Sequence, residues 1–206
     1  MKKILLLTGA FFIGGVANAQ TTYYASVKMG LGDVTIYQDD TKLEDYFAEF
    51  GFESSGLLLE ISPAIGIDWA VNPEGWLHFR LEAELGYNYY HENIKLKLDD
   101  IRMEIDFNQL FLLANWYANF RIDRFVPYVG VGLGHGWGTL TLNDESDGTE
   151  ESIDANGEIY ALHFGLGYRY SDITTFDLGA RRVYVPAEDD GQYVFDSIRL
   201  GARFRI

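Results

Sequence analysis

Residues 76–90 read WLHFRLEAELGYNYY, and apolar and polar side chains alternate along this stretch. The odd positions are all apolar or aromatic, whereas the even positions carry the charged residues Arg80, Glu82 and Glu84. Successive side chains of a β-strand point to opposite faces, whereas the pattern of an amphipathic helix repeats every 3.6 residues. The stretch therefore predicts a β-strand with one apolar face and one charged face.

Seven further segments show the same alternation, which brings the expected number of strands to eight. They cover residues 23–36, 57–71, 105–121, 126–142, 158–170, 174–185 and 193–206. The connections are alternately long (38–56, 91–100, 143–157) and short (72–75, 122–124, 171–173), with an intermediate last one (186–192). An outer-membrane barrel has short turns at its periplasmic end and longer loops outside. The chain is therefore predicted to be all-β, an eight-stranded antiparallel up-and-down transmembrane β-barrel. The even number of strands then places both termini in the periplasm.

Alternation alone leaves open which face is outside, because a soluble lipocalin-like barrel also has eight strands and keeps its apolar face inside. Charges distinguish the two, since a Lys or Arg facing lipid costs about 2–4 kcal/mol at mid-bilayer and little near the interface. The apolar faces carry three charges, Asp33, Arg182 and Asp196, all at the outer ends of strands. The opposite face combines many charges with the glycines of residues 130–138, which leave room for long lumen side chains. We therefore expect the apolar face to contact lipid.

The first nineteen residues have the features of a cleaved signal peptide. Two lysines precede a mostly apolar run at residues 4–16, and Ala17-Asn18-Ala19 is a small-x-small cleavage site. The apolar run is too short to cross a bilayer as a helix. We therefore expect a signal peptide at residues 1–19 and one outer-membrane β-barrel domain at residues 20–206.

Composition excludes several classes of function. The chain has no cysteine, which excludes disulfides, thiolate catalysis and Cys-ligated metals. A net charge of −15 argues against nucleic acid as a partner and allows cation binding. No segment after the signal peptide has the 18 consecutive apolar residues of a transmembrane helix. The expected partners are outer-membrane lipid, lipopolysaccharide and the barrel assembly machinery, and the sequence names no external ligand.

Several motifs carry a family resemblance. Residues 113–120 read LANWYANF, similar to a strand of the pattern Ala-Asn-x-Tyr-x-Asp-Phe, and residues 127–134 read PYVGVGLG. Further on, GLGYRY at 165–170 precedes FDLGAR at 176–181. With these motifs in this order, essentially the whole mature chain resembles the opacity/OmpA-type eight-stranded outer-membrane barrel family. The resemblance implies an outer-membrane location and no shared enzymatic reaction, because members act as structural proteins, small pores, adhesins or surface antigens.

The end of the chain resembles the C-terminal assembly signal of such barrels. Residues 199–206 read RLGARFRI, in which Gly201 and Phe204 match the signal, whereas Ile206 stands where the last aromatic residue is usual. The resemblance implies that Gly201, Phe204 and Ile206 are recognised by the assembly machinery, with Ile206 as the weak position.

An acidic connection at residues 143–154 has in part the spacing of an EF-hand calcium loop. Its oxygen-bearing positions 1, 3, 5, 9 and 12 are Asn143, Glu145, Asp147, Glu151 and Asp154. No flanking helices are expected and position 12 is not Glu, so a solvated external loop is the favoured interpretation. No cofactor is expected; weak Ca²⁺ or Mg²⁺ binding, bridging to lipopolysaccharide phosphates, is the candidate metal interaction.

Charges on the polar face are expected to pair inside the barrel. An eight-stranded barrel is just wide enough for its side chains to fill. We expect Glu82 and Glu84 to pair with Lys28, Arg181 or Arg199, as a structural ion-pair network rather than the gate of a pore, because buried charges need partners.

No catalytic residue is expected. Neither His135-Gly136-Trp137 nor His163-Phe164-Gly165 supplies the serine of a lipid A deacylase-type His/Ser pair. The chain is therefore expected to be a non-enzymatic integral outer-membrane barrel with an envelope-structural or surface-interaction role through its acidic external loops. The alternative is a small porin-like channel for ions or small solutes.

Overall fold

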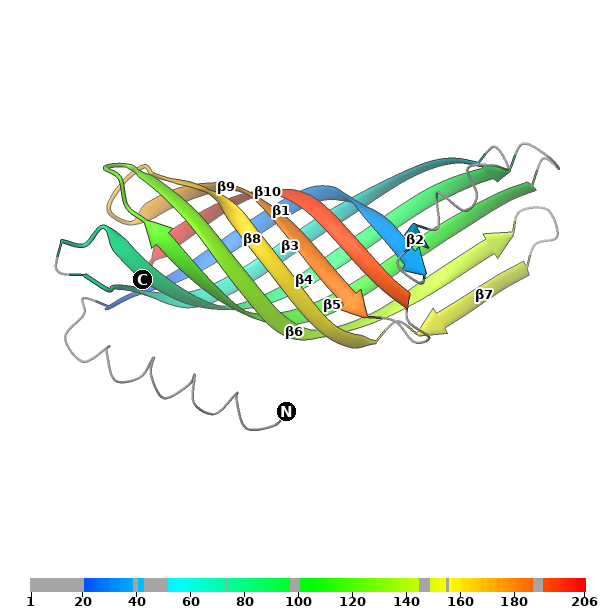
Figure 1. Cartoon of the computed structure of the whole chain (residues 1–206), viewed down its shortest axis with the longest axis horizontal. Coiled ribbons are helices and arrows are strands. Elements are labelled where there is room, and N and C mark those ends of the chain that lie inside the picture. The colour runs from blue at the N-terminus through cyan, green and yellow to red at the C-terminus, as the bar shows by residue number, and fades with distance from the viewer. Residues whose placement is uncertain are drawn as a thin grey trace.

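The computed structural model of this chain is a closed antiparallel β-barrel (Figure 1). It describes residues 21–38, 41–42, 52–72, 74–96, 101–144, 149–154, 156–186 and 191–206. The expected signal peptide at residues 1–19 lies outside these ranges. The wall consists of β1 (Thr21–Gln38), β3 (Phe52–Ala70), β4 (Leu77–Leu96), β5 (Ile101–Phe120), β6 (Phe125–Asp144), β8 (Gly157–Arg169), β9 (Thr174–Pro186) and β10 (Gly191–Arg205).

The last strand closes the barrel against the first. β10 pairs antiparallel with β1 from Tyr24↔Arg205 to Gln38↔Gly191, and every other long strand pairs with its neighbours in chain order. This confirms the predicted eight-stranded up-and-down barrel. No helix of the described residues is long and apolar enough to cross a membrane.

The two ends of the barrel differ, as the connection lengths predict. At one end, here called the short-turn end, three tight turns join β3 to β4, β5 to β6 and β8 to β9. Figure 1 places the C-terminus at this end too. The turn after β5 is closed by reciprocal backbone hydrogen bonds between Ile122 and Phe125, of 2.8 and 3.0 Å. It places Asp123 at φ 54°, which Asp tolerates better than most residues.

The opposite, long-loop end is built from strands that are longer than the alternation predicts. β4, β5 and β6 have 20 residues each, whereas β8 and β9 have 13. At about 3.3 Å per residue and a tilt near 45°, 20 residues rise well beyond the ~25 Å apolar band of a membrane barrel. Figure 1 shows β3 to β6 extending past β8 to β10 at this end. Two short strands lie here as well, β2 (Thr41–Lys42) against β1 and β7 (Thr149–Asp154) against β6.

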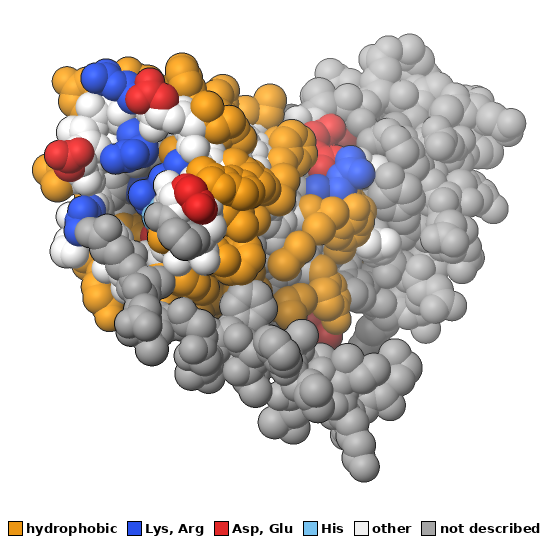
Figure 2. Space-filling view, turned by 60° about the vertical axis from the view of Figure 1, so that its left-hand side comes forward, with side chains coloured by type: hydrophobic (Ala, Val, Ile, Leu, Met, Phe, Trp, Pro, Cys, Tyr) orange, Lys and Arg blue, Asp and Glu red, His pale blue; other side chains and the backbone are white. Residues whose placement is uncertain are grey.

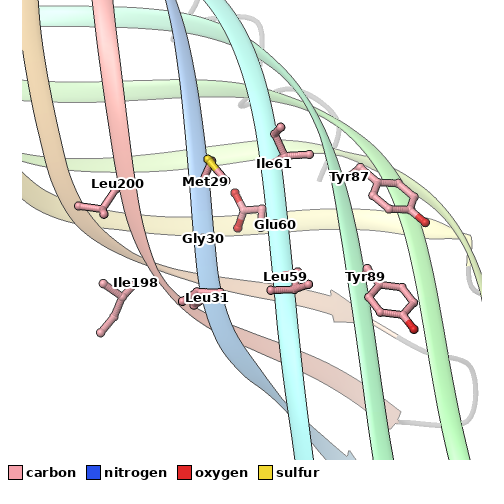
Figure 3. A pocket seen from close by; sticks show the side chains of 10 residues that line it. All are labelled: Met29, Gly30, Leu31, Leu59, Glu60, Ile61, Tyr87, Tyr89, Ile198 and Leu200. Atoms are coloured by element: carbon pink, nitrogen blue, oxygen red, sulfur yellow. The ribbon is translucent and has the colours of Figure 1, made fainter.

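The outer face of the wall is apolar. Figure 3 shows outward side chains of β1, β3, β4 and β10, and they line a groove of about 740 Å³ on the outside of the barrel. Met29 and Leu200 are 64% and 65% exposed, whereas Glu60, at an intervening position of β3, is buried. Apolar residues therefore point outward and charged residues inward, as expected for a barrel in lipid.

The expected count of three charges on the outer face was wrong. Asp106 and Glu158 lie there too: Asp106 accepts one hydrogen bond from the outward Tyr89 and contacts His91, and Glu158 accepts one from Tyr160. Both lie in the half of their strands that is toward the long-loop end, Glu158 as the second residue of β8 and Asp106 as the sixth residue of β5. Both lie within the predicted strands 105–121 and 158–170, at even positions that the alternation assigns to the apolar face, so the count of three was incomplete on the sequence pattern itself.

Candidate functional site

The lumen is filled by side chains arranged in layers along the barrel axis. The layer nearest the long-loop end, here called the apolar layer, contains Val34, Leu58, Tyr90, Phe107, Phe111, Leu113, Ile159, Ala161, Val183, Val185 and Phe195. The Phe107 and Phe195 rings stack with centroids 5.3 Å apart. Phe111, Leu58 and Leu113 are at most 1% exposed. The sequence-based interpretation missed this layer. The signal that could have revealed it is that Leu58, Phe111 and Leu113 are apolar residues at inward positions.

The next layer is an ion-pair layer centred on Glu84. Its carboxylate binds Lys28 Nζ at 2.6 Å, Arg199 Nη2 at 2.7 Å and Arg181 Nη1 at 3.2 Å. Asn115 Nδ2 donates to the same carboxylate at 3.0 Å. The residue is fully buried. The structure thus brings the predicted lumen residues together, with Glu84 as the acceptor that joins all three cations.

Two more carboxylates complete this layer. Lys28 also pairs with Glu82. Arg181 Nη2 and Arg199 Nη2 lie 2.6 and 2.8 Å from the oxygens of Glu60. Glu60 was not among the residues expected in the network, because an inward position does not reveal which cation reaches it across the barrel. Lys28, Arg181 and Arg199 therefore face three glutamates, so the ion-pair layer is balanced in charge.

Glycines of β6 give these side chains their space. A Cβ at Gly130 would collide with the Tyr117 ring, and one at Gly132 would collide with the Asn115 side chain. Both glycines pair with these β5 residues directly across the strands. The expectation that residues 130–138 make room for lumen side chains is confirmed at these positions.

Below the ion pairs, toward the short-turn end, one cation has aromatic neighbours instead of a carboxylate. The Arg80 guanidinium lies 3.7 Å from the ring centroid of Tyr117 and 5.2 Å from that of Tyr128. Arg80 is 2% exposed and forms no ion pair with the described residues. Cation–π contact offsets part of the cost of burying it. A cavity of about 20 Å³ beside these residues is large enough for one water molecule.

The four histidines have distinct surroundings. His78 Nδ1 lies 2.5 Å from Asp68, His91 Nδ1 lies 2.8 Å from Asp106, and His163 Nε2 lies 3.1 Å from Asn115 Oδ1. His135 contacts Trp137, with ring centroids 4.8 Å apart. None of these contacts involves a serine hydroxyl.

The chain's sequence and its fold point to the same family. The family model described as Outer membrane protein beta-barrel domain matches residues 4–205. The chain belongs to this family. It is therefore an integral outer-membrane β-barrel, and the resemblance seen in the sequence motifs is confirmed at the level of the family.

Solved structures of outer-membrane barrels share the fold. Neisserial surface protein A superposes with a TM-score of 0.53 at 14% identity, over 90% of this chain and 99% of that one. The attachment invasion locus protein Ail of Yersinia pestis, solved with the heparin analogue sucrose octasulfate, has a TM-score of 0.51 at 17% identity, over 89% and 99%. A comparison with curated proteins finds no match. At these identities the likeness concerns the fold.

The acidic connection of this outer-membrane barrel is a hairpin in its described part. β7 pairs with β6 so that Asn143 faces Glu150 and Asp154 faces Thr139. Asn143 and Asp154 are thus offset by four residues along the strands, or about 13 Å, whereas positions 1 and 12 of an EF-hand loop bind one ion. Glu145 and Asp147 lie outside the described residues, as does the side chain of Glu151. The loop expected at 149–154 is a strand because its backbone groups pair with β6.

The candidate assembly residues lie on the closing strand of the barrel. Gly201 pairs with Lys28 on β1, and Phe204, which is 44% exposed, pairs with Ala25. Ile206 follows β10, is 76% exposed, and its backbone N–H donates to the Tyr23 carbonyl at 3.0 Å.

Leu200→Arg tests whether the outer face contacts lipid. Leu200 lies on the outer face of β10, midway between Asp196 and Phe204, so we expect the substitution to reduce the free energy of folding into bilayers by about 2–4 kcal/mol. Ile122→Arg is the matched control, because Ile122 is 64% exposed, like Leu200, but lies in a turn. Urea titrations in lipid vesicles measure the free energy of folding of both variants. Equal, small effects of the two substitutions would contradict a lipid-facing wall.

Proposed function

We propose that this protein is a closed, non-enzymatic outer-membrane barrel that holds an acidic surface outside the cell and supports the integrity of the envelope. The observation that carries the proposal is the sequence of layers across the lumen. The apolar layer and the ion-pair layer lie one above the other, and both consist of buried side chains. A continuous water path would have to displace the aromatic rings and separate the ion pairs, which favours a closed barrel over the porin-like alternative.

The proposed orientation places the short-turn end in the periplasm and the long-loop end outside. It follows the usual arrangement of bacterial outer-membrane barrels, with short periplasmic turns and longer external loops. The signal peptide would direct export, and the barrel assembly machinery would insert the chain.

The long-loop end is the surface that this barrel would present. β3 to β6 and the β6–β7 hairpin extend beyond the other strands, and Glu150, Asp154 and Glu158 are exposed there. This end is acidic, so contact with lipopolysaccharide phosphates would need a divalent cation between them. Ail was solved with a polyanionic heparin analogue, and an acidic surface would repel such a ligand. The proposed external partner is therefore cationic or bridged by Ca²⁺ or Mg²⁺.

A complementation experiment tests the envelope role. A deletion strain is complemented with the wild type or with Glu150→Gln/Asp154→Asn/Glu158→Gln, and sensitivity to detergent and to a chelator is measured. We expect only the wild type to restore resistance fully. Full rescue by the triple variant would show that the acidic surface is not what the barrel contributes.

Planar-bilayer conductance of the refolded protein tests the closed lumen. We expect the wild type to show no steady conductance, because buried rings and ion pairs fill the barrel. Phe111→Ala/Phe195→Ala, which removes two rings of the apolar layer, should give more frequent openings. A large, steady wild-type conductance would contradict the closed barrel and favour the channel.

A further inference from the structure

The short-turn end of the lumen opens into a polar pocket of about 240 Å³, here called the mouth pocket. The residues of interest that line it are Arg121, Arg169, Arg203, Arg205, His78 and Ser171. They come from β4, β8, β10 and the ends of β5 and β8, which meet around the mouth. Figure 2, turned toward this end, shows several Lys and Arg side chains with Asp and Glu side chains among them and hydrophobic side chains around them.

The carboxylates inside the mouth already have partners. Asp177 accepts two hydrogen bonds from the Arg203 guanidinium, at 2.7 and 2.9 Å. Asp68 contacts His78 at 2.5 Å and accepts from Arg121 at 3.2 Å. These two acids therefore compensate Arg203 and Arg121.

Arg169 and Arg205 are left without a carboxylate partner among the described residues. The rim residue Asp172 is exposed and forms no ion pair with them. Burial lowers the pKa of Arg121, which follows the last residue of β5, and the positive charges of Arg169, Arg203 and Arg205 lower it further, against the opposing effect of Asp68. All four arginines line the same pocket. The mouth pocket thus concentrates uncompensated positive charge in a chain whose net charge is −15.

We propose that the mouth pocket binds a phosphate group, with Arg169 and Arg205 as its principal ligands. Guanidinium groups form paired, charge-assisted hydrogen bonds with phosphate oxygens, and several of them converging favour a doubly charged tetrahedral anion over a single carboxylate. Arg121 adds positive charge, and the Ser171 hydroxyl, on the rim, adds a neutral donor. The phosphate comes either free from solution or from the headgroup of a lipid at the same end of the barrel.

Titration of inorganic phosphate into the barrel in zwitterionic nanodiscs tests the site. Isothermal calorimetry at low ionic strength should show saturable binding to the wild type. Arg169→Gln/Arg205→Gln should weaken it at least about tenfold, since charge-assisted hydrogen bonds are lost. Within the described part of the chain neither arginine has an ion-pair partner to lose, and heat-modifiable gel mobility verifies that the double variant is folded.

Arg124→Gln is the matched control. Arg124 lies in the neighbouring β5–β6 turn, donates to the Tyr168 hydroxyl at 3.4 Å and does not line the mouth pocket. Its loss should leave the affinity for phosphate unchanged. Absence of saturable binding to the wild type, or an equal loss of affinity in the control, would overturn the proposal.

A second arm of the experiment identifies the source of the phosphate. The titration is repeated in nanodiscs that contain an anionic phospholipid. Arg124→Gln keeps the mouth pocket, so a competing lipid should act on this control as it does on the wild type. If the anionic lipid lowers the apparent affinity for inorganic phosphate equally in both proteins, the lipid headgroup occupies the pocket. If it stays the same, the site takes phosphate from solution; both results support the site itself.

Discussion

Glu84→Gln is expected to lower the free energy of unfolding by about 3–5 kcal/mol, because it removes one charge from a buried cluster and leaves cations without compensation. Glu84 accepts from Lys28, Arg199 and Arg181 in the fully buried ion-pair layer. Glutamine has nearly the same shape, so the effect reports the charge rather than a cavity. Unfolding in urea, followed by tryptophan fluorescence in vesicles, measures the change.

An exposed ion pair on the outer face gives the control for this prediction. Arg182 forms two hydrogen bonds of 2.7 Å to Asp196, and both side chains are about half exposed. Asp196→Asn should therefore cost less than about 1 kcal/mol. If Glu84→Gln were as mild as Asp196→Asn, water would have to reach the cluster, and the closed lumen would be contradicted.

Deletion of Phe204–Ile206 is expected to abolish assembly in the membrane of the cell. These residues pair β10 with β1 at Ala25, and the Ile206 N–H binds the Tyr23 carbonyl. Lipid offers no substitute for the lost backbone partners, because a barrel in lipid must close without a free edge. Cell fractionation and heat-modifiable gel mobility report the outcome, and normal assembly of the truncated chain would contradict it.

Refolding without the cell separates the two roles of the last strand. If Phe204 and Ile206 act as a signal for the assembly machinery, the truncated chain should refold in detergent micelles better than it assembles in cells, since most of the β10–β1 pairs remain. Ile206→Phe restores the usual aromatic terminus and should assemble as well as the wild type or better. Reduced assembly of Ile206→Phe would show that the resemblance to the assembly signal does not extend to this position.

The barrel was predictable from the sequence because period-two alternation is a local property. Each segment reveals which residues face inward, and Lys28, Glu82, Glu84, Arg181 and Arg199 follow from that alone. The partners within the layer were not predictable in the same way: Arg181 and Glu60 are 121 residues apart, and their contact depends on strand register around the whole barrel.

Other features of the lumen escaped prediction for related reasons. Arg80 alternates like its charged neighbours, and only the register shows that Tyr117 and Tyr128 surround it instead of carboxylates. The mouth pocket needs the ends of strands far apart in the chain to meet. The extra strand β7 forms from an acidic segment in which apolar and polar residues do not alternate, so the sequence does not predict a strand there. Its pairing with β6 depends on the neighbouring backbone rather than on a side-chain pattern.

The ion-pair layer also constrains the order in which the barrel forms. Glu60 and Glu84 are on β3 and β4, whereas Arg181 and Arg199 come from β9 and β10. While the sheet is still open, the glutamates lack most of their cations and must keep their hydration on its concave face. That face therefore loses its water in the same late step in which the final hairpin, β9 and β10, joins the sheet. An incomplete sheet gains no stability from these ion pairs. The ion-pair layer therefore stabilises only the closed barrel, so insertion should be all-or-none.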